Sequence, residues 1–217
     1  MKTLHARTAL HTHRRGLLLG LLAAATLPLL QGCFPVVATG VGAGAAMVSD
    51  RRTSGTYVED EAIEWKAGSR ISEHFGSNTH VNVTSYNRNV LLTGEVPNDN
   101  VRAEVERLVA AVANVKGTVN ELVVGPTSAL TARGNDTLIT SNVKARMVDA
   151  NTVPAHNVKV VTEANVVYLL GLVTRSEADA AAEVARTSQG VRKVVRVFEY
   201  ISDEEARRLD NPTGAKR

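Results

Sequence analysis

The chain has 217 residues, of which 25 are basic and 22 are acidic, and its single cysteine leaves no second thiol for an internal disulfide. Four of the basic residues and none of the acidic ones lie within the first 32 positions, so the rest of the chain has 21 basic and 22 acidic residues and a formal net charge of −1. Overall charge therefore gives no support to a nucleic-acid-binding protein, and we expect no nucleic-acid partner.

The N-terminal segment has the organisation of an export signal. A basic, acid-free start is followed by an apolar stretch from Gly16 to Leu30 and by Gly32, directly before Cys33. That stretch is shorter than the ~20 residues that a membrane-crossing helix needs, and the pattern is typical of a cleaved signal peptide. We expect residues 1–32 to be that signal. An ordinary signal with a chance cysteine is the alternative to a lipoprotein signal.

Leu30-Gln31-Gly32-Cys33 resembles the bacterial lipobox, in which the cysteine becomes the new N-terminus. The resemblance implies a covalent diacylglycerol and an N-acyl group on Cys33, with no other cofactor. Residues 33–57 then read as a lipidated cysteine and a flexible tether, because 34–49 are small, apolar and glycine-containing. Residues 202–217 form a charged tail with little to bury.

The remaining chain repeats itself at an offset of 76 to 77 residues. "HVNVTSYNRNVLLTGEV" (80–96) matches "NVKVVTEANVVYLLGLV" (157–173), with five apolar positions and one glycine in phase. Repeats of this length indicate two copies of one structural unit. We place the first domain at 58–124 and the second at 135–201, joined by a linker at 125–134 that contains glycine and proline.

Each copy predicts the element order α-β-β-α-β. In the first, Ile63, Ala67 and Ile71 recur every four residues, as in an amphipathic helix. Alternating apolar residues flank a turn at "SYNRN" (85–89), as in a β-hairpin. A capped helix and a closing strand at 118–124 follow. The predicted class is α+β, with two helices on one face of a small three-stranded mixed sheet in each domain.

The hairpin exits "VLLTGEV" (90–96) and "VYLLGLV" (167–173), with "GVRKV" (190–194), resemble the BON domain, a family named after bacterial osmotically induced and nodulation proteins. Together with the lipobox and "DRRTSGT" (50–56), they resemble the dual-BON outer-membrane lipoproteins. The resemblance implies a non-enzymatic protein that faces the periplasm, binds anionic phospholipid of the inner leaflet and supports envelope integrity, with links to osmotic stress and cell division.

The resemblance places lipid binding on the first helix of the second domain. That domain carries eight basic and seven acidic residues, whereas residues 60–124 of the first carry six and nine, and basic side chains favour an anionic surface. On a helical wheel Leu138 points away from the buried stripe, as an exposed leucine at a helix start. Related dual-BON proteins often have tryptophan there. The expected phospholipid-binding residues are Leu138, Ile139, Asn142, Lys144, Ala145 and Arg146. Trp65 is expected to pack between the repeats.

Other chemistry receives little support. We expect Gly94 and Gly171 to be structural glycines at a bulge or a close approach. No histidine after the signal has a second ligand at i+3 or i+4, so no metal site is expected. No catalytic motif is present, so we expect no enzyme. The alternative function is a periplasmic adaptor that binds envelope assembly or peptidoglycan-remodelling proteins.

Overall fold

The computed structural model describes residues 50–150 and 154–211. The predicted signal peptide, Cys33 and the tether up to residue 49 lie outside the described residues.

The first repeat begins with a long helix, followed by a hairpin, a second helix and a closing strand. Thr53 caps the first helix and Asn98 caps the second, each through a side-chain oxygen that accepts a backbone N–H. The elements are α3 (Ser54–Phe75), a 3-10 turn (Gly76–Asn78), β1 (His80–Tyr86), β2 (Asn89–Val96), α4 (Asp99–Ala110), β3 (Gly117–Asn120) and β4 (Val123–Val124).

The second repeat has the same order, and a short helix follows it. Thr174 and Glu177 form a capping box at the start of its second helix. The elements are α5 (Leu130–Ala150), a 3-10 turn (Ala155–Asn157), β5 (Val158–Glu163), β6 (Val166–Val173), α6 (Arg175–Arg186), β7 (Lys193–Tyr200) and α7 (Asp203–Asp210).

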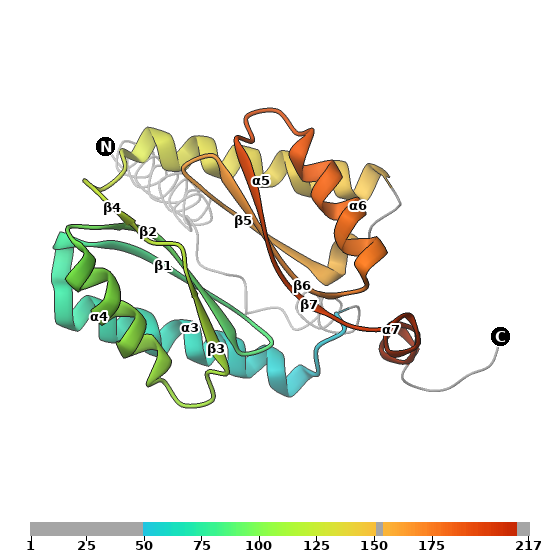
Figure 1. The fold of residues 1–217 in the computed structure, drawn as a ribbon, viewed down its shortest axis with the longest axis horizontal. Coiled ribbons are helices and arrows are strands. Elements are labelled where there is room, and N and C mark those ends of the chain that lie inside the picture. Colours follow the sequence, from blue (N-terminus) through green and yellow to red (C-terminus); the bar gives the residue numbers. More distant parts are fainter. Residues whose placement is uncertain (1–49, 151–153, 212–217) are drawn as a thin grey trace, which may run out of the picture. The chain divides into compact units, whose positions relative to one another are not determined.

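Both sheets are mixed, as predicted. In the first, β2 pairs antiparallel with β1 and parallel with β3 and β4, and in the second β6 pairs antiparallel with β5 and parallel with β7. In each repeat the two helices lie on the same face of the sheet (Figure 1). The α+β class with two tandem α-β-β-α-β domains is therefore confirmed. One detail differs: the closing strand of the first repeat is interrupted where Leu122 turns into the core.

Each repeat has its own hydrophobic core between the helices and the sheet. The predicted stripe of Ile63, Ala67 and Ile71 is buried in the first core. Ile139, Val143 and Met147 occupy the equivalent place in the second. These stripes confirm the helix phase that the spacing predicts.

A third cluster buries the opposite faces of the two sheets against each other. It contains Tyr86 and Leu91 from the first repeat and Tyr168, Leu170 and Leu172 from the second. The central strands β2 and β6 are consequently buried along almost their whole length. Their nearly continuous apolar sequences are typical of strands that are covered on both faces.

Two glycines lie where another chain segment approaches closely. A Cβ atom on Gly94 would lie 2.0 Å from the carbonyl oxygen of His80, and the φ angle of Gly94 is +112°. A Cβ atom on Gly171 would lie 2.5 Å from the carbonyl oxygen of Asn157. Neither position has room for a side chain.

We expect Gly94→Ala to destabilise the protein by about 2 kcal/mol, because alanine would combine an unfavourable φ angle with a backbone clash. Chemical denaturation measures the loss. Gly68→Ala is the matched control: its site on α3 has no atom within 4 Å of the added Cβ, so the helix should gain up to ~1 kcal/mol. Equal effects of the two substitutions would contradict the steric argument.

The last part of the tether predicted for residues 33–57 is folded, since α3 begins at Ser54 and Arg51 makes tertiary contacts. Arg51 is buried, and its guanidinium donates to Glu177 (2.7 and 2.8 Å), to Asp210 (2.8 and 2.9 Å) and to the carbonyl oxygen of Leu172 (2.9 Å). We call these residues the Arg51 clamp. The clamp attaches the segment before α3 to the second repeat and to α7, so part of the charged tail is folded.

A buried aspartate fixes the hairpin turn in each repeat. Asp60 accepts hydrogen bonds from the backbone N–H groups of Asn87 and Arg88 (2.8 and 2.7 Å). Asp136 accepts from those of Ala164 and Asn165 (2.9 and 2.8 Å). All four turn residues have positive φ angles. The carboxylates thus satisfy donors that a tight turn leaves without a partner in the ladder.

Candidate functional site

The exposed side of α5 carries the residue with the strongest sequence signal for membrane contact. Leu138 is 70 % exposed, and two further apolar side chains of α5 are also largely exposed: Leu130 and Val148. Leu130 and Val148 project in the same direction, and Leu138 lies about 80° away around the helix. We call the exposed residues of this side the α5 outer face: Leu130, Leu138, Ser141, Ala145 and Val148.

Two residues predicted to bind phospholipid are committed to the fold instead. Ile139 is only 4 % exposed and lies in the core of the second repeat. Arg146 donates to the carbonyl oxygen of Val184 (3.2 Å) and to the hydroxyls of Ser188 (2.8 Å) and Thr187 (3.1 Å). Arg146 therefore satisfies the C-terminal end of α6, which favours a cation. Ile139 is thus a core residue rather than a lipid-binding one, while the half-buried Arg146 is engaged by α6.

Asn142 and Ala145 lie one and two turns after Leu138 on its side of α5, whereas Lys144 lies about 120° around the helix from Leu138 and one turn before Val148. Ala145 and Lys144 are exposed, and Asn142 is half-buried. Lys144 forms no ion pair with any residue of 50–150 or 154–211. An exposed lysine next to exposed apolar side chains is the combination that an interfacial helix presents to an anionic membrane.

The start of α5 differs from the sequence-based expectation. The helix begins at Leu130, inside the predicted linker 125–134, and Leu138 lies more than two turns into it. The N–H groups at the helix N-terminus are thus not available to a headgroup next to Leu138. Asp136 is buried in this helix, and its carboxylate accepts from the hairpin turn.

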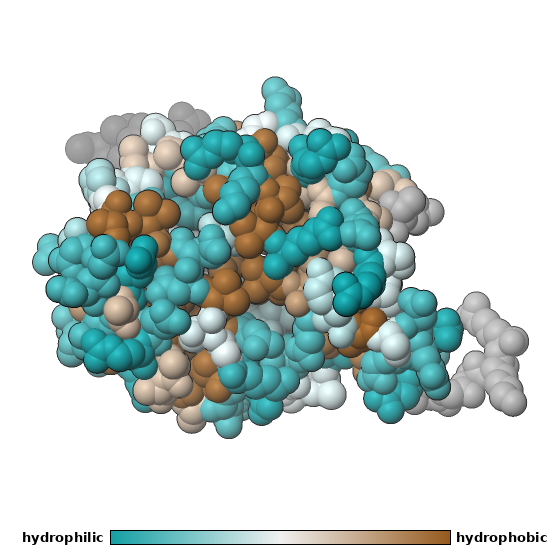
Figure 2. All heavy atoms as spheres, viewed as in Figure 1, coloured by the Kyte–Doolittle hydropathy of each residue, from teal (hydrophilic) through white to brown (hydrophobic). Residues whose placement is uncertain are grey.

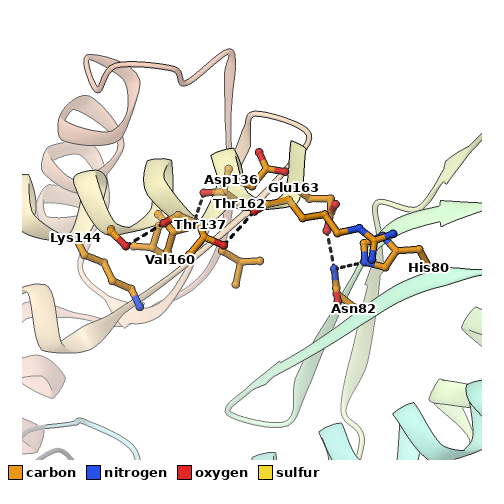
Figure 3. A pocket seen from close by; sticks show the side chains of 12 residues that line it. His80, Asn82, Asp136, Thr137, Lys144, Val160, Thr162 and Glu163 are labelled. Carbon is orange, nitrogen blue, oxygen red and sulfur yellow. Dashed lines mark hydrogen bonds between the residues drawn. The ribbon is translucent and has the colours of Figure 1, made fainter. Parts of the chain in front are cut away.

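A polar groove runs along α5 next to its outer face. It has a volume of about 530 Å³ and is lined by α5, by β5 and by two residues of β1, His80 and Asn82. Figure 3 shows Thr137 and Lys144 on α5 and Glu163 facing Asn82. Thr140 donates to Thr162 (2.7 Å), and Asn82 donates to Glu163 (2.7 Å). Much of the polar lining is thereby hydrogen-bonded within the protein.

Trp65 is 73 % exposed on α3, so the expectation that it packs between the repeats is wrong. The sheet faces meet through Tyr86, Leu91 and Tyr168 instead. The sequence did carry a signal for this contact between the sheets: apolar and polar residues do not alternate in β2 and β6. A helical wheel of α3 contains no information about those strands.

The described helices include none with the length and apolar character required to cross a bilayer. Hydrophilic residues cover most of the face viewed in Figure 2, with hydrophobic residues in separate patches.

Comparison with known proteins decides the family. The BON domain model matches residues 59–126 and 135–202, which correspond to the two structural repeats. The chain belongs to the BON-domain family. The resemblance noted in the hairpin exits is thus confirmed.

Several relatives are similar over most of their length. The chain is 38 % identical to the outer membrane lipoprotein DolP of Haemophilus influenzae, over 84 % of this chain and 95 % of that protein. It is 34 % identical to the 21 kDa hemolysin of Actinobacillus pleuropneumoniae, over 70 % and 79 % of the two chains. Osmotically-inducible protein Y of Escherichia coli K12 is 28 % identical, over 72 % and 80 %.

Proposed function

We propose that this BON-family protein is a non-enzymatic lipoprotein, anchored through Cys33 in the outer membrane and facing the periplasm, which binds anionic phospholipid and supports envelope integrity. The similarity to the outer membrane lipoprotein DolP supports the location. The exposed Leu138 and the exposed Lys144 of the same helix carry the proposal of lipid binding. Lys144 forms no ion pair within residues 50–150 and 154–211.

The proposed contact combines two physical contributions. Leu138 enters the boundary between headgroups and acyl chains, where burying a leucine side chain contributes about 1.5–3 kcal/mol. Lys144 contributes about 1 kcal/mol near an anionic surface. Leu130, Ala145 and Val148 extend the apolar contact, while Ile139 and Arg146 support the helix from within. Such a contact is weak alone and depends on the acyl chains at Cys33 for lasting attachment.

Vesicle binding by the chain from residue 34 onward tests this contact without the acyl anchor. We expect binding to vesicles that contain phosphatidylglycerol and little binding to neutral phosphatidylcholine vesicles. Leu138→Glu should weaken binding to the anionic vesicles by about tenfold or more, because it removes apolar burial and adds repulsion. Co-sedimentation at low and physiological salt measures both effects.

Val58→Glu is the matched control, because Val58 is also exposed but lies on α3. It should leave vesicle binding unchanged, and circular dichroism should show both variants folded. Equal binding to neutral and anionic vesicles, or equal loss in both variants, would count against the α5 outer face.

A protein-binding adaptor is the second candidate, and the exposure of Trp65 favours it. Tryptophan is enriched at the centres of protein interfaces, and Val58 lies two helical turns away on the same side of α3. Crosslinking in cells separates the two functions. Capture of one stoichiometric envelope protein that survives Leu138→Glu and is lost in Trp65→Ser would favour the adaptor.

A further inference from the structure

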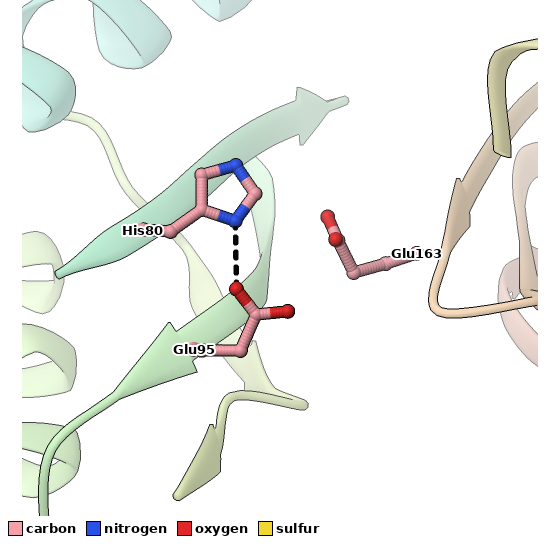
Figure 4. A group of neighbouring side chains, drawn as sticks. All are labelled: His80, Glu95 and Glu163. Atoms are coloured by element: carbon pink, nitrogen blue, oxygen red, sulfur yellow. Dashed lines mark hydrogen bonds and ion pairs between the residues drawn. The ribbon is translucent and has the colours of Figure 1, made fainter. Parts of the chain in front are cut away.

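We propose that His80, Glu95 and Glu163 form a binding site for a divalent cation of the zinc type, which joins the two repeats. One ring nitrogen and one carboxylate oxygen from each glutamate lie within 4.8 Å of one another. Figure 4 shows the three side chains converging from strands of both repeats. The proposal is separate from lipid binding, since none of the three belongs to the α5 outer face.

The fold brings these residues together from distant parts of the sequence. His80 begins β1 and pairs directly with Glu95 on β2. Glu163 ends β5 in the other repeat, just before the turn that Asp136 holds. The ligands are 15 and 68 residues apart along the chain, so a search for ligands at helical spacing could not find them.

The site concentrates negative charge at a buried position. Glu95 and Glu163 are both buried, and the partly buried His80 lies 2.9 Å from Glu95. Arg133 lines the same groove, but its guanidinium donates to the side chain and the carbonyl oxygen of Ser128 (3.1 and 3.0 Å). Two buried carboxylates thus share one imidazole, and a divalent cation would neutralise both.

The internal repeat supplies a comparison within the same molecule. At the offset of 77, the positions of His80, Glu95 and Glu163 correspond to Asn157, Leu172 and Tyr86. The Tyr86 hydroxyl donates to the carbonyl oxygen of Asn157 (3.3 Å), so the equivalent contact between the repeats also forms. The Tyr86 hydroxyl also donates to the Asp50 carboxylate (3.2 Å), but the three corresponding positions themselves hold no histidine or carboxylate. The fold therefore does not require a histidine and two glutamates at these positions.

The donor set suits zinc better than magnesium or calcium. Imidazole nitrogen with carboxylate oxygens is typical of zinc sites, whereas magnesium and calcium prefer oxygen ligands alone. Tetrahedral zinc, with bonds of about 2.0–2.2 Å, places its ligands about 3.4 Å apart. The side chains would need to contract from their present spacing by rotamer changes. The groove gives access for a fourth, water ligand, and Asn82 orients Glu163 from the second coordination sphere.

Zinc titration of the full chain, purified in detergent, tests the site. We expect saturable binding of one Zn²⁺ per chain by isothermal titration calorimetry, a higher midpoint of thermal unfolding with Zn²⁺, and neither effect with Mg²⁺. Glu163→Gln and His80→Ala should each weaken Zn²⁺ binding by at least about tenfold. Co²⁺ in place of Zn²⁺ should give the visible absorption of a tetrahedral site, which both variants lose.

His74→Ala is the matched control, because His74 is an exposed histidine near Glu104 (3.8 Å) in the same repeat. It should leave Zn²⁺ binding unchanged. Glu163→Gln is nearly isosteric, and thermal unfolding without metal reports whether it folds. Absence of saturable binding in the wild type overturns the proposal, as does full-affinity binding in both site variants. Loss in His74→Ala with retention in Glu163→Gln would also overturn it, by assigning the metal to a surface site.

Discussion

Arg51→Ala is expected to lower the free energy of unfolding by about 3 kcal/mol or more. The substitution removes a buried guanidinium and leaves Glu177, Asp210 and the Leu172 carbonyl without their shared donor. Breaking a buried pair from one side is strongly destabilising, because the partner charge stays behind. The partial exposure of Asp210 keeps the expected loss at the lower end of the range for buried pairs.

The same clamp predicts how stability depends on pH. Hydrogen bonds from Arg51 lower the pKa of Asp210. Burial acts to raise the pKa of Glu177, but hydrogen bonds from Arg51 and from the Thr174 backbone outweigh it, so that this pKa is also lowered. The clamp's contribution is therefore complete above the ordinary carboxyl pKa values of 3.8 and 4.5, and it is lost as the pH falls further.

Urea unfolding from pH 7 down to pH 3 measures both effects. The difference in stability between wild type and Arg51→Ala should be largest at neutral pH and should shrink in acid. Arg107→Ala is the control, since the Arg107–Glu104 pair is an exposed i,i+3 contact on α4, worth about 0.3–0.5 kcal/mol. A difference that stays constant across this pH range would contradict the assigned role of the two carboxylates.

Asp60→Ala should have an effect of similar size, at about 3 kcal/mol. Besides the two turn amides, the Asp60 carboxylate accepts from the Ser85 hydroxyl (2.7 Å) and from Arg52 (2.8 Å). Alanine would leave several buried donors unsatisfied, each at a cost of about 1–3 kcal/mol before relaxation. Asp136→Ala should cost less, because only the two turn amides bind that carboxylate in the described part of the chain.

Chemical denaturation of the two variants checks this order. Glu61→Ala is the control, because Glu61 is the exposed neighbour of Asp60 on the same helix and should change stability by less than about 0.5 kcal/mol. Hydrogen exchange at Asn87 and Arg88 should rise in Asp60→Ala. Unchanged protection of these amides would mean that the turn holds without the carboxylate.

The fold was predictable because its signals are local. Buried residues such as Ile63, Ala67 and Ile71 recur with the helical period of about 3.6 residues, so the sequence itself shows the helix. The internal repeat shows each pattern a second time. The predictions were wrong at the ends of some elements, where a helix extends into a segment whose composition is typical of a loop. Gly134 suggests a linker, yet it lies inside α5, because packing of the helix outweighs the cost of about 1 kcal/mol for a glycine in it.

The candidate site was less predictable than the fold, because a side chain is free to bind a lipid only when no other part of the protein hydrogen-bonds or buries it. A helical wheel places Arg146 near Leu138, but it cannot show the carbonyl and hydroxyl groups of α6 that engage the guanidinium. Asp60 and Arg51 likewise look like surface charges until the hairpin turn and α7 approach them. Leu138 was identified correctly as exposed because the absence of a partner follows from helix phase alone.

The Arg51 clamp also determines where a mechanical load on the proposed Cys33 anchor would be applied. Asp50 lies 17 residues after Cys33, a length that spans at most about 60 Å when fully extended. A membrane moving away from the folded unit would pull first on Arg51, whose bonds reach the second repeat and α7 while its own backbone leads into the first. The force would therefore be distributed over both repeats, so that the first repeat would not unfold on its own. The proposed lipid attachment and the cohesion of the two domains would in this way be coupled at one arginine.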